Sequence, residues 1–170
     1  SAEAQRVLES YFPDIIQVDD VADVTEELVR RWALAYPSVG LVLIGAGPPC
    51  QGVSGLNSDR KGALKDCRSN LFTHVPRITQ LFRVCFPWAQ VHRLMESVAS
   101  MDAQDCWTMS EEIGELPWYV DACGVTLCHR PRLYWIIWEL LQGDGVAFGY
   151  GSEGALPFQG EVSLEAQVDG

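Results

Sequence analysis

Residues 41–44 (LVLI) constrain the fold more than any other segment, because four consecutive apolar residues lead directly into a loop rich in glycine and proline. A short apolar run without polar alternation is typical of a strand that is buried on both faces of a parallel sheet. Such a sheet needs helices on its faces and parallel strands beside it. The run therefore predicts an α/β fold.

The segments before this run predict its first neighbours. Residues 2–11 have the spacing of a short helix, with Val7 and Leu8 facing inward. Residues 15–18 (IIQV) predict a short strand that ends just before Asp20.

Helices and strands continue to alternate after residue 44, and this alternation favours a mostly parallel sheet. The predicted helices cover residues 26–36, with Thr25 as N-cap, residues 70–86 and residues 111–116. The further predicted strands cover residues 91–98, 119–125 and 133–138.

Three polar side chains fall at or just beyond the ends of predicted strands, namely Asp20, Cys50 and Glu96. In sheets of this kind, ligands bind at the carboxyl ends of the strands. We therefore expect these three residues to share one site.

The chain changes character near residue 142, where glycines become frequent and periodicity fades. By composition alone, residues 142–170 predict a Gly-rich linker or loosely packed tail, which leaves residues 1–141 as one domain. With 170 residues in all, the chain suits a single domain with a substantial core.

Composition narrows the class of protein. With 48% hydrophobic and 21% charged residues the chain is typical of globular proteins, and it has no apolar run long enough to cross a membrane. The net charge of −11 argues against a freestanding nucleic-acid binder. The charge is segregated, however, since residues 60–93 contain seven of the 12 basic residues and one of the 23 acidic ones.

The loop after the apolar run contains a cysteine, and later segments contain an acid and two arginines. A pyrimidine C5 carbon becomes a nucleophile when a thiolate adds to C6, and the resulting charge needs an acid near N3 and cations near O2. Cys50, Glu96, Arg130 and Arg132 supply these groups.

Four motifs stand in one order along the chain: residues 12–21 (FPDIIQVDDV), 47–54 (GPPCQGVS), 94–98 (LMESV) and 129–135 (HRPRLYW). This order resembles that of the C5-cytosine-specific DNA methyltransferases. Residues 57–62 (NSDRKG) and the spacing of Arg130, Arg132 and Trp135 most resemble the eukaryotic de novo (type 3) group. The resemblance covers about residues 5–138.

The resemblance implies a catalytic role for four residues. Cys50 would attack C6 of a cytosine, and Glu96 would protonate or hydrogen-bond N3. Arg132 would hold O2, while Arg130 would support the nucleophile loop. The cytosine would have to flip out of the DNA helix to reach this site.

The resemblance also implies binding residues. Asp20, Val21, Ala22 and Leu71 would bind S-adenosyl-L-methionine, with the first three around its adenine. Pro49, Gln51, Ser54, Arg60 and Lys61 would bind the DNA.

The fold implied is a Rossmann-like S-adenosylmethionine-dependent methyltransferase fold that is incomplete. The family's first strand with its Phe-x-Gly-x-Gly loop and its target-recognition domain have no counterpart here, and Ser97 stands where the family has asparagine. We therefore expect a partial catalytic domain of a nuclear enzyme, whose partners are DNA and either other methyltransferase subunits or the rest of a longer chain. Alone, it would have weak activity or none.

Two other functions remain open. One is a tRNA cytosine-5 methyltransferase, and the other is a catalytically inactive methyltransferase-like scaffold that binds a partner. No metal is predicted, because Cys123, Cys128 and His129 lack a Cys-x-x-Cys pair and a second half-site.

Overall fold

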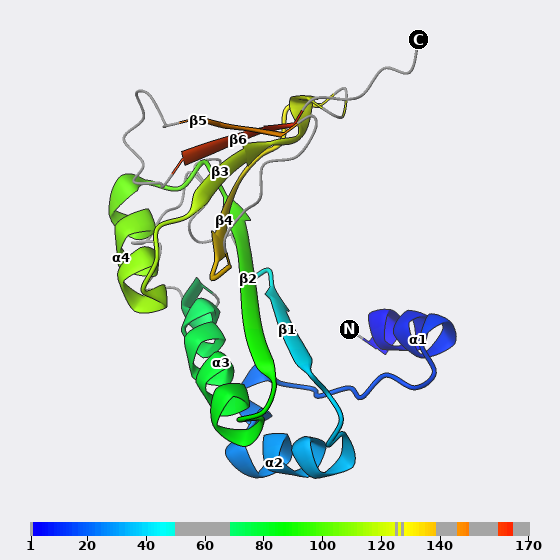
Figure 1. The fold of residues 1–170 in the computed structure, drawn as a ribbon. Helices are drawn as coiled ribbons and strands as arrows, with labels where there is room; N and C mark the ends of the chain where they lie inside the picture. The colour runs from blue at the N-terminus through cyan, green and yellow to red at the C-terminus, as the bar shows by residue number, and fades with distance from the viewer. Residues whose placement is uncertain are drawn as a thin grey trace.

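The protein is described here by a computed structural model, which describes residues 2–49, 69–124, 126, 128–138, 146–149 and 160–164. Strands and helices build an α/β fold around one six-stranded sheet, with the order β1-β2-β4-β3-β6-β5 (Figure 1). The strands are β1 (Leu41–Ala46), β2 (Gln90–Val98), β3 (Trp118–Asp121), β4 (Pro131–Ile136), β5 (Val146–Gly149) and β6 (Gly160–Leu164). The predicted fold class is confirmed at this level, and the architecture is compatible with a Rossmann-like fold.

The sheet is mixed, and the prediction of a mostly parallel sheet is corrected. Strand β1 pairs with β2, and β3 with β6, in parallel. The pairs β2–β4, β3–β4 and β5–β6 are antiparallel. Only residues 122–130 separate β3 from β4, and a parallel crossover needs a dozen residues or more, so β4 must run back along β3.

Four α-helices accompany the sheet in the described residues: α1 (Ala2–Tyr11), α2 (Glu26–Ala35), α3 (His74–Cys85) and α4 (Ala103–Ile113). Short 3-10 turns, η1 (Val21–Asp23), η3 (Ser69–Thr73) and η4 (Ala122–Gly124), join some of them. Helix α3 packs against β2 and α2, whereas α1 stands apart from the sheet (Figure 1). No helix among these has the length and apolar character to span a membrane.

Two apolar clusters hold the elements together. The larger contains the fully buried Met95, Leu133 and Trp135, which join the centre of the sheet to α4. The smaller joins α2 to α3 through Val29 and Phe86. The core therefore lies on the side of the sheet where the helices pack.

Helix α2 forms as predicted. Thr25 has extended backbone, and its hydroxyl accepts a hydrogen bond from Leu28 N at 3.3 Å. This N-cap satisfies a backbone donor that the first helical turn would otherwise leave unpaired.

The N-terminal expectations are corrected in two places. Helix α1 has the predicted bounds, but Val7 is 56% exposed and Leu8 39%, so these side chains do not face a core. Residues 15–18 form no strand, and Ile15 and Ile16 are exposed. A strand needs a partner for its backbone groups, and no strand of the described sheet offers one to this segment.

Strand β1 forms, but it is not buried on both faces. It is the edge strand of the described sheet, where Leu41 is 58% and Leu43 65% exposed. Val42 faces the other way and packs against the cluster between α2 and α3. The apolar run thus has one covered face.

Several boundaries also differ from those predicted. Helix α4 begins at Ala103 after the N-cap Asp102 and ends at Ile113. The C-cap Gly114 follows, and its positive φ of 86° closes the helix in the left-handed region. Strand β3 stops at Asp121 and turns into η4. Strands β5 and β6 lie within residues 142–170, so at these positions a sheet edge replaces the expected linker or tail.

Candidate functional site

Glu96 and Arg132 form the centre of the candidate site. They lie on neighbouring antiparallel strands, where Glu96 is opposite Tyr134 and Arg132 is opposite Val98. This diagonal register puts both side chains on one face of the sheet. Arg132 Nε donates to Glu96 Oε1 at 2.6 Å, an ion pair joining two residues 36 positions apart in the sequence.

The pair is accessible to a ligand. The side chain of Glu96 is 34% exposed and that of Arg132 23%. Arg132 Nη1 also donates to the carbonyl of Pro131 at 2.8 Å, which fixes the guanidinium plane at the start of β4. Beneath Glu96, its neighbours Met95 and Ser97 are buried, so the strand is anchored while the carboxylate is open.

Gly47, which follows β1, lies beside this pair. A Cβ atom built on Gly47 would lie 3.7 Å from Glu96 Oε2. One carboxylate oxygen of Glu96 therefore faces Arg132 and the other faces the residue that follows β1. Pro48 and Pro49 continue from Gly47, with Pro48 half-buried and Pro49 exposed.

The predicted thiol follows Pro49 directly in the sequence, and several other predicted residues come after it. Cys50, Gln51, Ser54, Arg60 and Lys61 lie outside the described residues.

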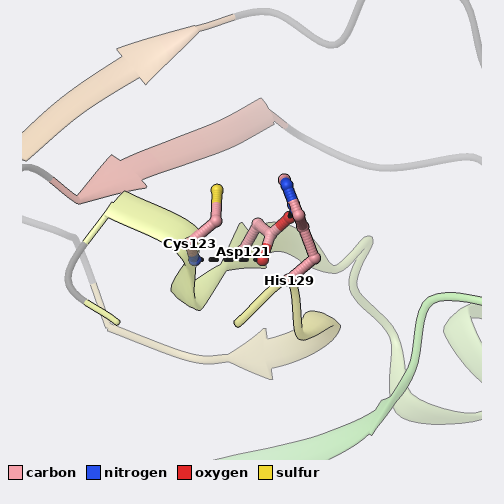
Figure 2. Close-up of side chains that lie close together, drawn as sticks. All are labelled: Asp121, Cys123 and His129. Carbon is pink, nitrogen blue, oxygen red and sulfur yellow. Dashed lines mark hydrogen bonds and ion pairs between the residues drawn. The ribbon is translucent and has the colours of Figure 1, made fainter. Parts of the chain in front are cut away.

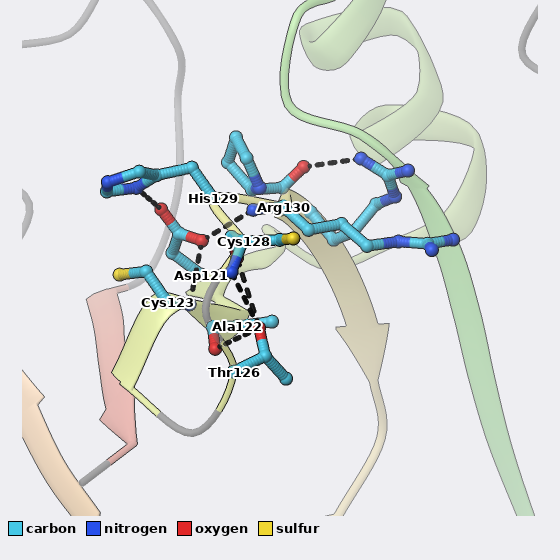
Figure 3. A network of polar contacts seen from close by, with 9 residues as sticks. Asp121, Ala122, Cys123, Thr126, Cys128, His129 and Arg130 are labelled. Atoms are coloured by element: carbon cyan, nitrogen blue, oxygen red, sulfur yellow. Dashed lines mark hydrogen bonds and ion pairs between the residues drawn. The ribbon is translucent and has the colours of Figure 1, made fainter.

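Arg130 is held through its backbone. Its N–H donates to Asp121 Oδ1 at 2.8 Å, whereas its side chain is exposed (Figure 3). The same carboxylate oxygen accepts from Cys123 N at 3.1 Å. Asp121 thus ties the segment before β4 to the end of β3, and in this way it fixes the approach to Arg132.

Hydrogen bonding lowers the pKa of Asp121 from 3.8 to about 2. The largest cause is the hydrogen bond from His129, and the next is the N–H of Arg130. Asp121 Oδ2 lies 3.1 Å from His129 Nδ1. Sequence reasoning missed this residue, although an aspartate at the end of an apolar strand (WYVD) was a signal available in the sequence.

The predicted adenine-binding residues are found in a capped turn. Asp20 Oδ1 accepts from Ala22 N at 2.8 Å and so forms the N-cap of η1. Arg77 of α3 donates to the carbonyls of Val21 at 2.9 Å and Val24 at 2.7 Å. Asp20 is not at the end of a strand, because residues 15–18 form none.

This turn has the chemistry that an adenine requires. An adenine presents an amine that needs an acceptor and a flat apolar ring, and Asp20 offers an exposed carboxylate while Val21 is half-buried. Leu71 is half-buried in η3, which leads into α3, the helix that carries Arg77. An exposed acceptor beside half-buried apolar side chains is compatible with an adenine.

Comparison of the sequence with models of known protein families and with curated proteins finds no match.

Proposed function

We propose that this chain carries part of the catalytic domain of a DNA cytosine-5 methyltransferase. The ion pair between Glu96 and Arg132 supports the proposal most directly, because the sequence motifs predict both residues for one reaction. Gly47 adds a second point of support, since the residue three positions before Cys50 lies against the carboxylate of Glu96.

The proposed chemistry assigns one task to each residue. The Cys50 thiolate adds to C6 of a flipped cytosine, and the negative charge moves toward N3 and O2. Glu96, in its protonated form, donates its carboxyl proton to N3, and Arg132 donates to O2. Both groups already stand side by side on one face of the sheet, so only a small movement is needed to place them against the developing charge, which lowers the barrier.

The remaining residues hold and orient the catalytic segment, the cofactor and the DNA. Arg130 and Asp121 fix the segment before β4 through the 2.8 Å backbone bond. Asp20, Val21, Ala22 and Leu71 would hold the adenine end of S-adenosylmethionine, which supplies the methyl group when bound. Pro49, Gln51, Ser54, Arg60 and Lys61 would contact the nucleotide and its phosphates, in a nuclear enzyme of the type 3 kind.

Only some basic residues of residues 60–93 are available for this DNA contact. Arg77 is engaged with two backbone carbonyls, and Arg93 is 4% exposed. Neither is available to a phosphate. DNA binding through residues 60–93 therefore rests on the other five basic residues, which are exposed Arg83 of α3 and residues 60, 61, 65 and 68.

The first half of the reaction can be measured without the methyl donor. Addition of the thiol at C6 makes C5 basic, so a cytosine deuterated at C5 exchanges with solvent protons. We expect this exchange in duplex DNA incubated with the chain, and we expect Glu96→Gln to slow it by about 100-fold or more because N3 loses its acid. Mass spectrometry of the recovered nucleoside measures the rate.

A matched variant and a trap complete this experiment. Glu112→Gln changes an exposed glutamate of α4 in the same way and should leave the exchange unchanged. DNA that contains 5-fluorocytosine, with S-adenosylmethionine present, should form a covalent adduct that Cys50→Ser abolishes. If a chain that carries the complete catalytic domain gives no exchange and no adduct with DNA, the proposal is refuted. A reaction confined to RNA would transfer the proposal to the tRNA enzymes.

A further inference from the structure

The end of β3 and the start of β4 bring together three side chains that the proposed methyl transfer does not need as ligands. Asp121, Cys123 and His129 each offer one donor atom, and these atoms lie within 4.8 Å of one another (Figure 2). Within the described residues this is the one such group of three. Cys123, Cys128 and His129 alone predict no zinc site, but the fold places Asp121 beside Cys123 and His129.

The backbone around this group is fixed by hydrogen bonds. Asp121 Oδ1 accepts from the backbone N–H groups of Cys123 and Arg130, so Oδ2 is the oxygen turned to His129. Thr126 Oγ1 donates to the carbonyls of Ala122 at 2.9 Å and Cys128 at 3.1 Å (Figure 3). Hydrogen bonds thus hold the described residues around the three side chains in place before any ion binds.

The distances suit a small ion after a slight movement. Tetrahedral zinc with bonds of about 2.0 to 2.3 Å separates its ligand atoms by about 3.3 to 3.6 Å. The Oδ2 to Nδ1 distance is 3.1 Å already. Cys123 and His129 are exposed, so rotation of their side chains can close the remaining gap without disturbing the core.

The donor set selects the class of ion. Thiolate and imidazole are preferred by zinc and its first-row neighbours, whereas magnesium and calcium prefer oxygen ligands alone. Three protein ligands leave a fourth position, and exposure at the surface lets water fill it.

We propose that Asp121 Oδ2, Cys123 Sγ and His129 Nδ1 form a surface site for a zinc-class divalent ion. The ion would replace the hydrogen bond between Asp121 and His129 and would leave the two backbone bonds to Oδ1 in place. It would cross-link the end of β3 to the segment before β4, three residues from Arg132. The three side chains bind no substrate in the proposed methyl transfer, although Asp121 also fixes the segment that leads to Arg132.

Cobalt is the probe, because its thiolate bond gives a charge-transfer band and its tetrahedral complexes absorb strongly in the visible. The chain is stripped with chelator, kept reduced, and titrated with Co²⁺. We expect one equivalent to bind with both bands, and Zn²⁺ to displace it. Cys123→Ser should remove the charge-transfer band and weaken binding tenfold or more.

Cys128→Ser is the matched control, since Cys128 is exposed in the same turn but is not one of the three donors. It should leave the spectrum and the affinity unchanged. Hydrogen exchange of residues 121–130 should slow on addition of Zn²⁺ in the wild type and in Cys128→Ser, but not in Cys123→Ser. The proposed site would be overturned if the wild type failed to bind Co²⁺. It would also be overturned if the charge-transfer band survived in Cys123→Ser, or if the band were lost only in Cys128→Ser.

Discussion

Two arginines of the sheet region have opposite surroundings. Arg132 reaches Glu96 at 2.6 Å on an open face. Arg93, by contrast, is 4% exposed, donates to the carbonyl of Ile113 at 3.1 Å, and lies 3.6 Å from Glu115. Burial lowers the pKa of Arg93. Burial also raises the pKa of Glu115, although the positive charge of Arg93 acts to lower it. Arg93 therefore has a structural role, while Arg132 is available to a ligand.

Replacing Arg93 should reveal this role in the pH dependence of stability. Arg93→Met leaves the Ile113 carbonyl without its donor and Glu115 without its counter-charge, and we expect a loss of about 1 to 3 kcal/mol at pH 7. In the folded protein the pKa of Glu115 lies above its usual 4.5. Protonation of Glu115 therefore favours the folded state as the pH falls from 7 toward the pKa of Glu115 in the folded protein. The deficit of the variant should therefore shrink between pH 7 and pH 5.

Urea unfolding of the wild type and the variant at both pH values measures this difference. Glu112→Gln changes an exposed carboxylate and serves as control, with no expected pH effect of this kind. A deficit of equal size at both pH values would contradict the coupling of Arg93 to Glu115.

At the level of elements, side-chain caps mark where two of the described helices begin. Thr25 caps α2 and Asp102 caps α4, each through a side-chain oxygen that accepts a backbone N–H. The start of α4 was predicted too late, although Cys106, Met109 and Ile113 are buried at helical spacing after the Asp102 cap. The turn at Asp121 works similarly, because one carboxylate sets the path of the following residues.

The cap of α2 can be tested against a second threonine. Thr25→Ala removes the acceptor of Leu28 N and should lower the unfolding free energy by about 1 kcal/mol. Thr108→Ala, within α4, removes only an exposed bond to the Gln104 carbonyl and should be neutral or slightly stabilising, because alanine favours helix. Thermal unfolding followed by circular dichroism compares them, and equal losses in both variants would show that the cap contributes nothing special.

At the level of the whole molecule, the sheet has unequal faces near β1. Leu133 and Trp135 of β4 are fully buried in the larger cluster, whereas Leu41 and Leu43 of β1 are mostly exposed. Half-buried His92 and Trp138 line a shallow hollow together with these two leucines. Stability therefore comes from the side where α3 and α4 pack.

Substitution of one leucine on each face tests whether the two faces of the sheet contribute unequally to stability. Leu133→Ala opens a cavity in the larger cluster and should cost about 2 to 5 kcal/mol. Leu43→Ala removes a side chain that is 65% exposed and should change the unfolding free energy by about 0.5 kcal/mol or less. Denaturant midpoints give both values. A loss at Leu43 that approaches the loss at Leu133 would mean that this face of β1 is covered.

The local pattern of residues in the sequence was enough to predict part of this structure. The α/β class, the bounds of α1, the cap of α2 and strand β2 could be predicted, because each depends on residues a few positions apart. The choice of Glu96 and Arg132 as a functional pair came from motifs and chemistry. Their contact at 2.6 Å did not, since it follows from the pairing of β2 with β4.

Tertiary structure decided the rest, because burial and strand direction depend on what lies across the sheet. The apolar residues 41–44 were the starting point, yet they lie at an edge with one face exposed, and residues 15–18 lack a strand to pair with. The short connection after Asp121 turned β4 back along β3 and made the sheet mixed. That return also gathered Asp121, Cys123 and His129, which no spacing rule had grouped.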